Sequence, residues 1–216
     1  MINEEKPEKK HHSPEEIRAE ERQRIIRRID PHFVFNTLGA IRIATKTNAD
    51  LAYNMIYDFS KYLRAVFHAL TDEETILFRE EAACIVCYAD LEKIRFGENI
   101  TICMEIEEEN FMIPPLSVPP LIENAVRYGL LNGRIKGTVT VKSYQTDTEY
   151  IVQVEDDGTG FEAAGYDSIP GDDGPQAGGL QRVRYRVEKM TGGRVDIKSF
   201  VGIGTIVTLR IPKKEG

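Results

Sequence analysis

Residues 150–160 read YIVQVEDDGTG, in which apolar and polar residues alternate up to a turn that contains two aspartates and two glycines. Alternation with a period of two is typical of a half-buried strand, so YIVQVED predicts one. Glycine tolerates backbone conformations that other residues avoid, and tight turns use it for that reason. The stretch therefore predicts a strand that ends in a glycine turn beside Asp156 and Asp157.

The sequence on either side of this strand alternates between strand and helix patterns. Strands are predicted over 100–106 and over TVTVKSY, and a closing hairpin over RVDIKSF and TIVTLRIP. Helices are predicted near 119–130 and over 179–191. The C-terminal part of the chain therefore predicts an α/β sandwich.

Glycine recurs at two further places in this part of the chain. The pair Gly178-Gly179 opens a predicted helix, and GIGT (202–205) lies in the predicted hairpin. Backbone needs alone explain any one cluster, because hairpins and helix starts use glycine. Together the clusters indicate a nucleotide held by backbone amides, with phosphate at the helix N-terminus. The Gly-, Asp- and Pro-rich stretch 161–177 is either an unstructured insertion or a lid over that ligand.

The predicted helix near 119–130 carries the sequence IENAVRYGL. Arg127 and Tyr128 follow Asn124 by three and four residues, so an amide oxygen and a guanidinium group are expected in one cleft. Magnesium prefers oxygen ligands and brings phosphates and waters of its own, so one protein amide is sufficient. The alternative is that Asn124 caps a helix or is solvated.

The first half of the chain follows a helical pattern up to Gly97. Helices are predicted over 14–29, from Pro31 onward, over 49–70 and over 76–96, with a break at Asp30-Pro31 because proline disfavours helix in the residue before it. The second and third helices should pack antiparallel to each other. Their expected inward residues are Phe33, Val34, Leu38, Ile41 and Ile43 in one, and Leu51, Met55, Phe59, Leu63, Val66, Phe67 and Leu70 in the other.

Composition excludes several classes of protein. The chain has 216 residues and a net charge of −7, so it lacks the basic field that binding to nucleic acid requires. No apolar run reaches the roughly 18 to 20 residues of a membrane span, and the N-terminus is charged, so we expect a cytoplasmic chain with no membrane segment. The pair Cys84 and Cys87 suggests redox or metal chemistry, or simply two small residues on one helix face. We favour the latter, since no second cysteine pair or nearby histidine completes a site.

Five motifs occur in a fixed order: IDPHFVFNTL, PPLIENAVRYG, VEDDGTGF, GGLQRVRYRV and GIGTIVTLRIP. In this order and spacing the chain resembles the sensor histidine kinases of the autolysis-regulator (LytS-like) type, over about residues 20–212. The resemblance implies an α+β chain in which a helical dimerisation and phosphoacceptor region precedes an ATP-binding domain of the GHKL (Bergerat) fold. The expected divisions are a leader over 1–13, the helical region over 14–97 and the ATP-binding domain over 98–216.

The resemblance also implies roles for individual residues. His32 matches the phosphoacceptor, Asn124 the magnesium-binding residue of the N box, and Asp156 the carboxylate that accepts from the adenine amino group. Without the other motifs, a buried histidine bonded to a backbone carbonyl would be the simpler reading of His32. The remaining residues expected around the nucleotide are Arg127, Tyr128, Gly158, Gly160, Gly178, Gly179, Leu180, Gly202, Gly204 and Thr205.

The implied function is ATP- and Mg²⁺-dependent autophosphorylation of His32 in a homodimer, followed by transfer to an aspartate of a response-regulator receiver domain. Such a chain is free-standing or is the cytoplasmic portion of a membrane-anchored receptor. The chain departs from the family at Asp30, Tyr128, Ala177 and Arg182, where Asn, His, Gly and Asn are usual. These departures keep open a degenerate nucleotide-binding module without catalysis. A hydrolytic GHKL ATPase is disfavoured, because Pro120 stands where such relatives carry the general-base glutamate.

Overall fold

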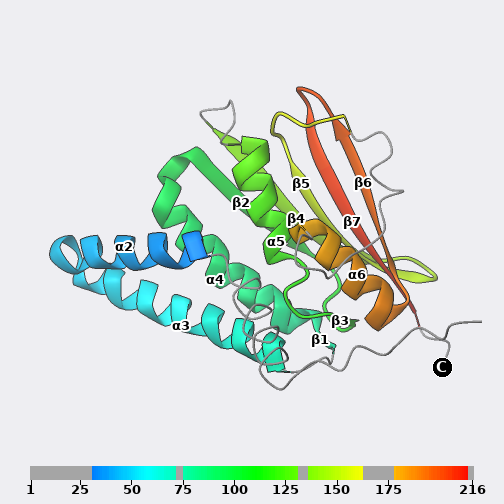
Figure 1. The fold of residues 1–216 in the computed structure, drawn as a ribbon, viewed down its shortest axis with the longest axis horizontal. Coiled ribbons are helices and arrows are strands. Elements are labelled where there is room, and N and C mark those ends of the chain that lie inside the picture. Colours follow the sequence, from blue (N-terminus) through cyan, green and yellow to red (C-terminus); the bar gives the residue numbers. More distant parts are fainter. Residues whose placement is uncertain (1–30, 72–74, 131–135, 163–177, 214–216) are drawn as a thin grey trace, which may run out of the picture.

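The structure is a computed structural model that describes residues 31–71, 75–130, 136–162 and 178–213. Within these ranges, helices form one side of the molecule and a twisted sheet covered by helices forms the other (Figure 1). The predicted leader 1–13, the helix over 14–29, Asp30 and most of the loop 161–177 lie outside the described residues. No described helix combines the length and the apolarity that crossing a membrane requires.

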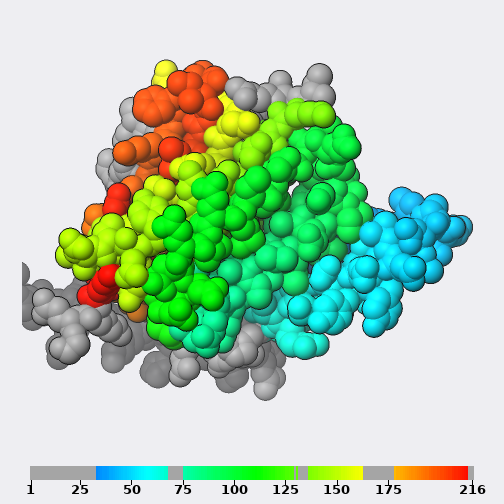
Figure 2. Space-filling view, turned by 180° about the vertical axis from the view of Figure 1, so that it is seen from behind, coloured from blue at the N-terminus to red at the C-terminus, as the bar shows by residue number. Residues whose placement is uncertain are grey.

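Two long helices form an antiparallel hairpin at the N-terminal side. Helix α2 spans Pro31–Thr47 and α3 spans Ala49–Thr71, so the predicted helix start at Pro31 is confirmed. Asn48 lies between the two helices. Its Oδ1 accepts a hydrogen bond from the Leu51 N–H in the first turn of α3, at 3.0 Å. The end of the hairpin projects beyond the rest of the molecule (Figure 2).

A third helix, α4 (Phe78–Phe96), packs across this hairpin. The Phe33 ring lies 5.0 Å from the ring of Tyr62 on α3 and 4.9 Å from that of Tyr88 on α4. The predicted start at Ile76 is two residues early, because Ile76 and Leu77 instead form strand β1, which pairs with β3 (Met112–Ile113).

The predicted inward faces of α2 and α3 are partly right. Phe33, Ile41, Met55, Phe59 and Val66 are buried, and Val34, Leu51 and Leu63 pack partly against the core. The prediction is wrong for Leu38, Ile43 and Phe67, which are exposed. Helix α4 covers one side of the hairpin, and these three residues are on the parts of α2 and α3 that it leaves exposed. The Leu70 side chain lies outside the described residues.

The sheet has five strands in the order β2-β4-β5-β7-β6. Strand β2 (Ile100–Ile106) runs parallel to β4 (Gly137–Gln145), and β5 (Glu149–Asp156), β6 (Arg194–Phe200) and β7 (Gly204–Pro212) complete it with antiparallel pairs. All five strand predictions are confirmed. A 3₁₀ turn, η1 (Gly97–Asn99), joins α4 to β2.

Helices lie against one face of this sheet. They are α5 (Pro119–Asn124), its continuation η2 (Ala125–Leu130) and α6 (Gly179–Thr191), with α4 alongside (Figure 1). The predicted helix over 119–130 therefore forms, but its second half winds as a wider π-helix. Alternate residues of the strands fill the layer between, among them Val139, Val141, Val152, Val154 and Leu209. One continuous hydrophobic core runs from α2 and α3 through α4 into this layer.

Candidate functional site

A cavity of about 630 Å³ opens between α5, η2, the start of α6 and the sheet. It brings together predicted site residues that are up to 81 positions apart in the sequence, from Asn124 to Thr205. The predicted residues that line it are Asn124, Tyr128, Asp156, Gly160, Gly178, Gly179, Leu180 and Thr205.

The end of β5 places Asp156 at the cavity. Its Oδ1 accepts a hydrogen bond from the Gly158 N–H at 2.9 Å, which closes the turn that the glycine pattern predicts. The neighbouring Asp157 is used differently, since its Oδ1 accepts from the Thr138 N–H at 2.8 Å and ties β5 to the start of β4. Of the two adjacent carboxylates, Asp156 therefore serves the cavity and Asp157 the sheet.

Two glycines allow this turn to lie against the β6–β7 hairpin. A Cβ atom on Gly160 would stand 2.1 Å from the carbonyl oxygen of Phe200, and one on Gly204 would stand 1.9 Å from that of Asp156. Both have positive φ, +57° and +135°, which side chains disfavour. The Gly202 N–H donates to the Thr159 carbonyl at 2.6 Å. Thus Gly158, Gly202 and Gly204 support the turn beside the cavity, but they are not among the described residues that line it.

Thr205 lies opposite Asp156 in the β5–β7 register. Its hydroxyl is 2.9 Å from the hydroxyl of Ser199 on β6, and Ser199 in turn accepts from the Phe161 N–H at 2.9 Å. A carboxylate and a hydroxyl thus meet at one end of the cavity, an arrangement suited to a ligand edge with N–H donors. Sequence reasoning missed Ser199, which no glycine motif contains.

The walls of this end are apolar, and sequence reasoning missed them too. Val154, Ile197 and Val207 come from three neighbouring strands and face the same side of the sheet. Leu121 and Ala125 oppose them from the helix, and Phe161 closes the edge. The alternating strand pattern was the available signal, since it places every second residue on the covered face. Apolar walls with a few convergent polar groups are typical of sites for small molecules.

At the other end of the cavity α5 and α6 converge. Gly178 precedes the first turn of α6, and its N–H donates to Oε1 of Gln181 at 2.9 Å. A Cβ atom on Gly179 would lie 3.6 Å from Cβ of Pro120 and 3.9 Å from Nδ2 of Asn124. The first turn of α6 contains no acidic residue. Free N–H groups at a helix N-terminus attract anions, so this end suits phosphate.

Arg127 is not among the residues that line the cavity. Its guanidinium group lies 4.0 Å from the Glu123 carboxylate and 5.4 Å from the ring centre of Tyr128, and the side chain is exposed. The spacing argument assumed 3.6 residues per turn, whereas the chain from Ala125 onward is a π-helix with more residues per turn. The Asn124 face therefore continues to Tyr128 and not to Arg127.

His32 is the second residue of α2, and the described residues that line the cavity all lie between Leu121 and Val207. Its side chain lies outside the described part of the structure. The predicted phosphoacceptor and the cavity thus belong to different regions of the molecule.

Cys84 and Cys87 are buried free thiols on α4. Burial raises the pKa of both, so they stay protonated and weakly nucleophilic at neutral pH. The described residues contain no group of three or more His, Cys, Asp or Glu side chains placed to hold a metal ion. The burial of both thiols on one helix agrees with the interpretation of the pair as helix packing.

Two family models match the chain. The one described as "Histidine kinase" matches residues 21–100, and the one described as "Histidine kinase-, DNA gyrase B-, and HSP90-like ATPase" matches residues 118–215. The sensor protein LytS of Oceanobacillus iheyensis is 28% identical over 136 residues, which are 62% of this chain and 23% of LytS. The chain belongs to the LytS-like histidine kinase family. The second matched range contains all described residues that line the cavity, so the cavity lies in the part of the chain that matches the ATPase model.

Other similarities agree with this family. The sensor histidine kinase YpdA of Escherichia coli K12 is 33% identical over 189 residues, which are 87% of this chain and 33% of YpdA. The chain therefore spans about a third of that relative's length. The histidine kinase ThkA, solved in complex with the response regulator protein TrrA, matches with a TM-score of 0.50 and 16% identity, over 92% of this chain and 60% of ThkA. At that identity the likeness shows the fold alone, and it agrees with the predicted α+β fold class.

Proposed function

We propose that this histidine kinase chain binds ATP with Mg²⁺ in the cavity, transfers the γ-phosphoryl group to His32, and passes it on to an aspartate of a response-regulator receiver domain. The observation that carries the proposal is the polarity of the cavity. A carboxylate and a hydroxyl stand at its apolar end, and an amide and a helix N-terminus stand at the other.

At the apolar end, the Asp156 carboxylate would accept a hydrogen bond from the adenine amino group. Thr205 would add a hydroxyl to the same edge, and the apolar side chains of β5, β6 and β7 would contact one face of the ring. Purine rings are flat and largely apolar, so such a slot binds them mainly by excluding water. The carboxylate then selects for a ring edge that donates.

At the polar end, the amide oxygen of Asn124 would be a magnesium ligand and the N–H group of Gly179, in the first turn of α6, would face the phosphates. These residues fit the group, because Mg²⁺ needs few protein ligands when phosphates and waters complete its octahedron. The bound Mg²⁺ would neutralise phosphate charge. The chain's own residues would position the nucleotide, and no acidic side chain in the first turn of α6 would repel its phosphates.

His32 would act as the nucleophile of the transfer. An imidazole with a pKa near 6.5 has a free ring nitrogen at neutral pH, and phosphoryl transfer needs mainly positioning and charge neutralisation. His32 lies on α2, and the described residues that line the cavity lie between Leu121 and Val207, so transfer would bring the cavity and α2 together, within one chain or between two.

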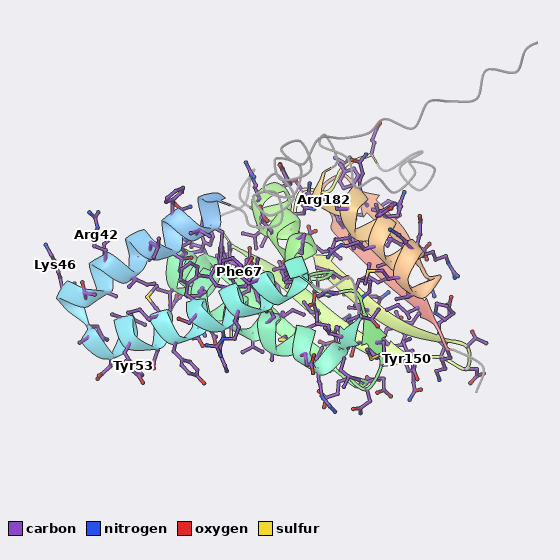
Figure 3. The ribbon with its side chains drawn as sticks, turned by 60° about the horizontal axis from the view of Figure 1, so that its bottom comes forward. Arg42, Lys46, Tyr53, Phe67, Tyr150 and Arg182 are labelled. Atoms are coloured by element: carbon purple, nitrogen blue, oxygen red, sulfur yellow. The ribbon has the colours of Figure 1, made fainter. Side chains whose placement is uncertain are left out.

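A homodimer through α2 and α3 would supply that second chain. Large apolar side chains are exposed on this hairpin, and Tyr53 projects from α3 into the open (Figure 3). Exposed apolar surface on this scale marks an interface. A two-fold pairing of hairpins would bury it. The exposed residues are Phe35, Leu38, Ile43, Tyr53, Ile56, Tyr57 and Phe67.

The test is labelling with γ-labelled ATP and Mg²⁺. We expect one protein phosphate that survives alkali and is lost in acid, as a phosphoramidate is. His32→Gln should remove the label and leave ATP affinity unchanged, while His68→Gln, on α3, should keep the label. An acid-stable label, or a label that persists in His32→Gln, would refute the assignment. ATP binding without any label would favour the degenerate nucleotide-binding module.

A further inference from the structure

Two glutamates of α4 are buried, and their surroundings differ. Glu81 and Glu92 are each 1% exposed, although carboxylates are seldom buried without polar partners. Glu92 bonds Arg95 on its own helix at 2.7 Å. Glu81 instead accepts hydrogen bonds from a segment more than 30 residues away in the sequence. Its carboxylate therefore joins separate elements, whereas the carboxylate of Glu92 is paired within α4.

The segment that Glu81 holds is the start of α5. Oε2 of Glu81 accepts from the Leu116 N–H and Oε1 from the Val118 N–H, both at 2.9 Å. Val118 is the residue before the first turn of α5. Leu116 has a φ of +56°, a conformation that residues with a side chain seldom adopt. Burial raises the pKa of Glu81, and the two N–H donors and the nearby Arg186 oppose that rise.

The same segment is held from the other side by α6. The guanidinium group of Arg186 donates to the carbonyl oxygens of Pro115 and Leu116, the latter at 2.7 Å. Residues 115–118 are thus bonded to α4 through Glu81 and to α6 through Arg186. Because residues 115–118 lead into α5, these bonds set the position of α5 relative to α6. Those are the two helices that supply the polar end of the cavity.

Asn124 stands at the far end of the helix that begins here. Asn124 lies six positions after Val118, and this spacing corresponds to a rise of about 9 Å along an α-helix. A hydrogen-bonded helix moves as a rigid piece, so a displacement at residues 116–118 reaches Asn124. Asn124 and Gly179 are neighbours across the cavity, since a Cβ atom on Gly179 would lie 3.9 Å from Nδ2 of Asn124, so such a displacement would change their relative position.

We propose that Glu81 is a positioning residue for the nucleotide site: by holding residues 116–118 it sets where Asn124 stands relative to the N-terminus of α6. The inference rests on the proposed function, because Asn124 has a ligand there only if magnesium and nucleotide bind. Helix α4 also packs on α3. Glu81 thus links the helical region that contains His32 with the metal end of the nucleotide site.

The decisive variant is Glu81→Gln, which keeps the size of the side chain but has one acceptor oxygen for two N–H donors. Calorimetry should measure the affinity for ADP with Mg²⁺ and with EDTA, and the ratio of the two affinities reports the contribution of the metal. We expect this ratio to fall about tenfold, as for loss of groups that support a metal ligand. The affinity in EDTA should change by less than about twofold, because the adenine end is untouched.

Glu92→Gln is the matched control, because it makes the same change on the same helix at the same burial, about three helical turns from Glu81. It should keep the wild-type ratio. A wild-type ratio in Glu81→Gln, or an equal fall in Glu92→Gln, would overturn the inference.

Arg186→Lys provides a second route if Glu81→Gln does not fold. Lysine keeps the charge but lacks the planar fork that reaches two carbonyl oxygens. The same fall in the ratio is expected, and an unchanged ratio would overturn the inference. A wild-type protein whose ADP affinity ignores Mg²⁺, or an Asn124→Ala variant that keeps the metal effect, would instead refute the proposed function and this inference with it.

Discussion

The ATP-binding domain and the α2–α3 hairpin differ in how far the described chain covers their apolar residues. In the domain, the inward residues of β4, β5 and β7 are covered by helices of the same chain. In the hairpin, α4 covers one side, and large apolar side chains on the other side are exposed. The described lining of the cavity thus comes from one chain, whereas the exposed side of the hairpin is the surface that the proposed homodimer would cover.

The largest expected effect compares two phenylalanines on α2. Phe33 is 2% exposed among aromatic rings, and Phe35 is 72% exposed. Phe33→Ala should lower the free energy of unfolding by about 3 to 5 kcal/mol, as for other buried aromatic residues. Phe35→Ala should change it by less than about 0.5 kcal/mol in the monomer. Urea unfolding at low protein concentration measures both, and equal losses would contradict the division of the hairpin into a covered and an uncovered side.

A second comparison tests the different roles of the two adjacent carboxylates at the end of β5. Asp156→Ala should weaken ATP binding at least about a hundredfold, or about 2.8 kcal/mol, while thermal stability is kept. Asp157→Ala is the control, since it removes the bond to Thr138 and should cost about 1 kcal/mol of stability with ATP affinity retained. Calorimetry with ATP and a thermal melt measure the two effects. Unchanged affinity in Asp156→Ala would move the adenine site elsewhere.

The smallest expected effect concerns association. Ile43 on the hairpin is 63% exposed, and Val201 at the tip of the β6–β7 hairpin is 70% exposed. Ile43→Lys should weaken self-association about tenfold, since a charge would then face an apolar interface, whereas Val201→Lys should leave it unchanged. Sedimentation over a range of concentrations measures both variants. Equal effects of the two substitutions would show that the hairpin is not the interface.

Glycine and proline made much of the fold predictable. Pro31 stands at the start of α2, and alternation located the five strands of the large sheet but not the short strands β1 and β3. The signals that succeeded arise from local backbone geometry. The glycines at 160 and 204 were placed correctly beside the predicted turn, since the close approach of two backbones there excludes any side chain. Local backbone geometry of this kind depends on a few residues, so the sequence alone can predict it.

Other features depended on neighbours that are distant in the sequence. Leu38, Ile43 and Phe67 were predicted to face inward, but all three are exposed. Helical spacing shows which apolar residues share a helix face, but it does not show whether the rest of the chain covers that face. Arg127 was predicted in the cleft because the spacing rule cannot anticipate a π-helix. Glu81 carried no signal at all, since a glutamate in the first turn of a helix is ordinarily solvated.

The sequence by itself determined the order of helices and strands, the family, and the residues that carry the nucleotide motifs. Short-range backbone preferences and five ordered motifs are sufficient for that. Only the tertiary structure decided that Asp157 ties β5 to the start of β4, that Ser199 supports Thr205, and that Glu81 holds the start of α5. Each of these depends on a hydrogen bond between elements that only the packed chain brings within about 3 Å of each other.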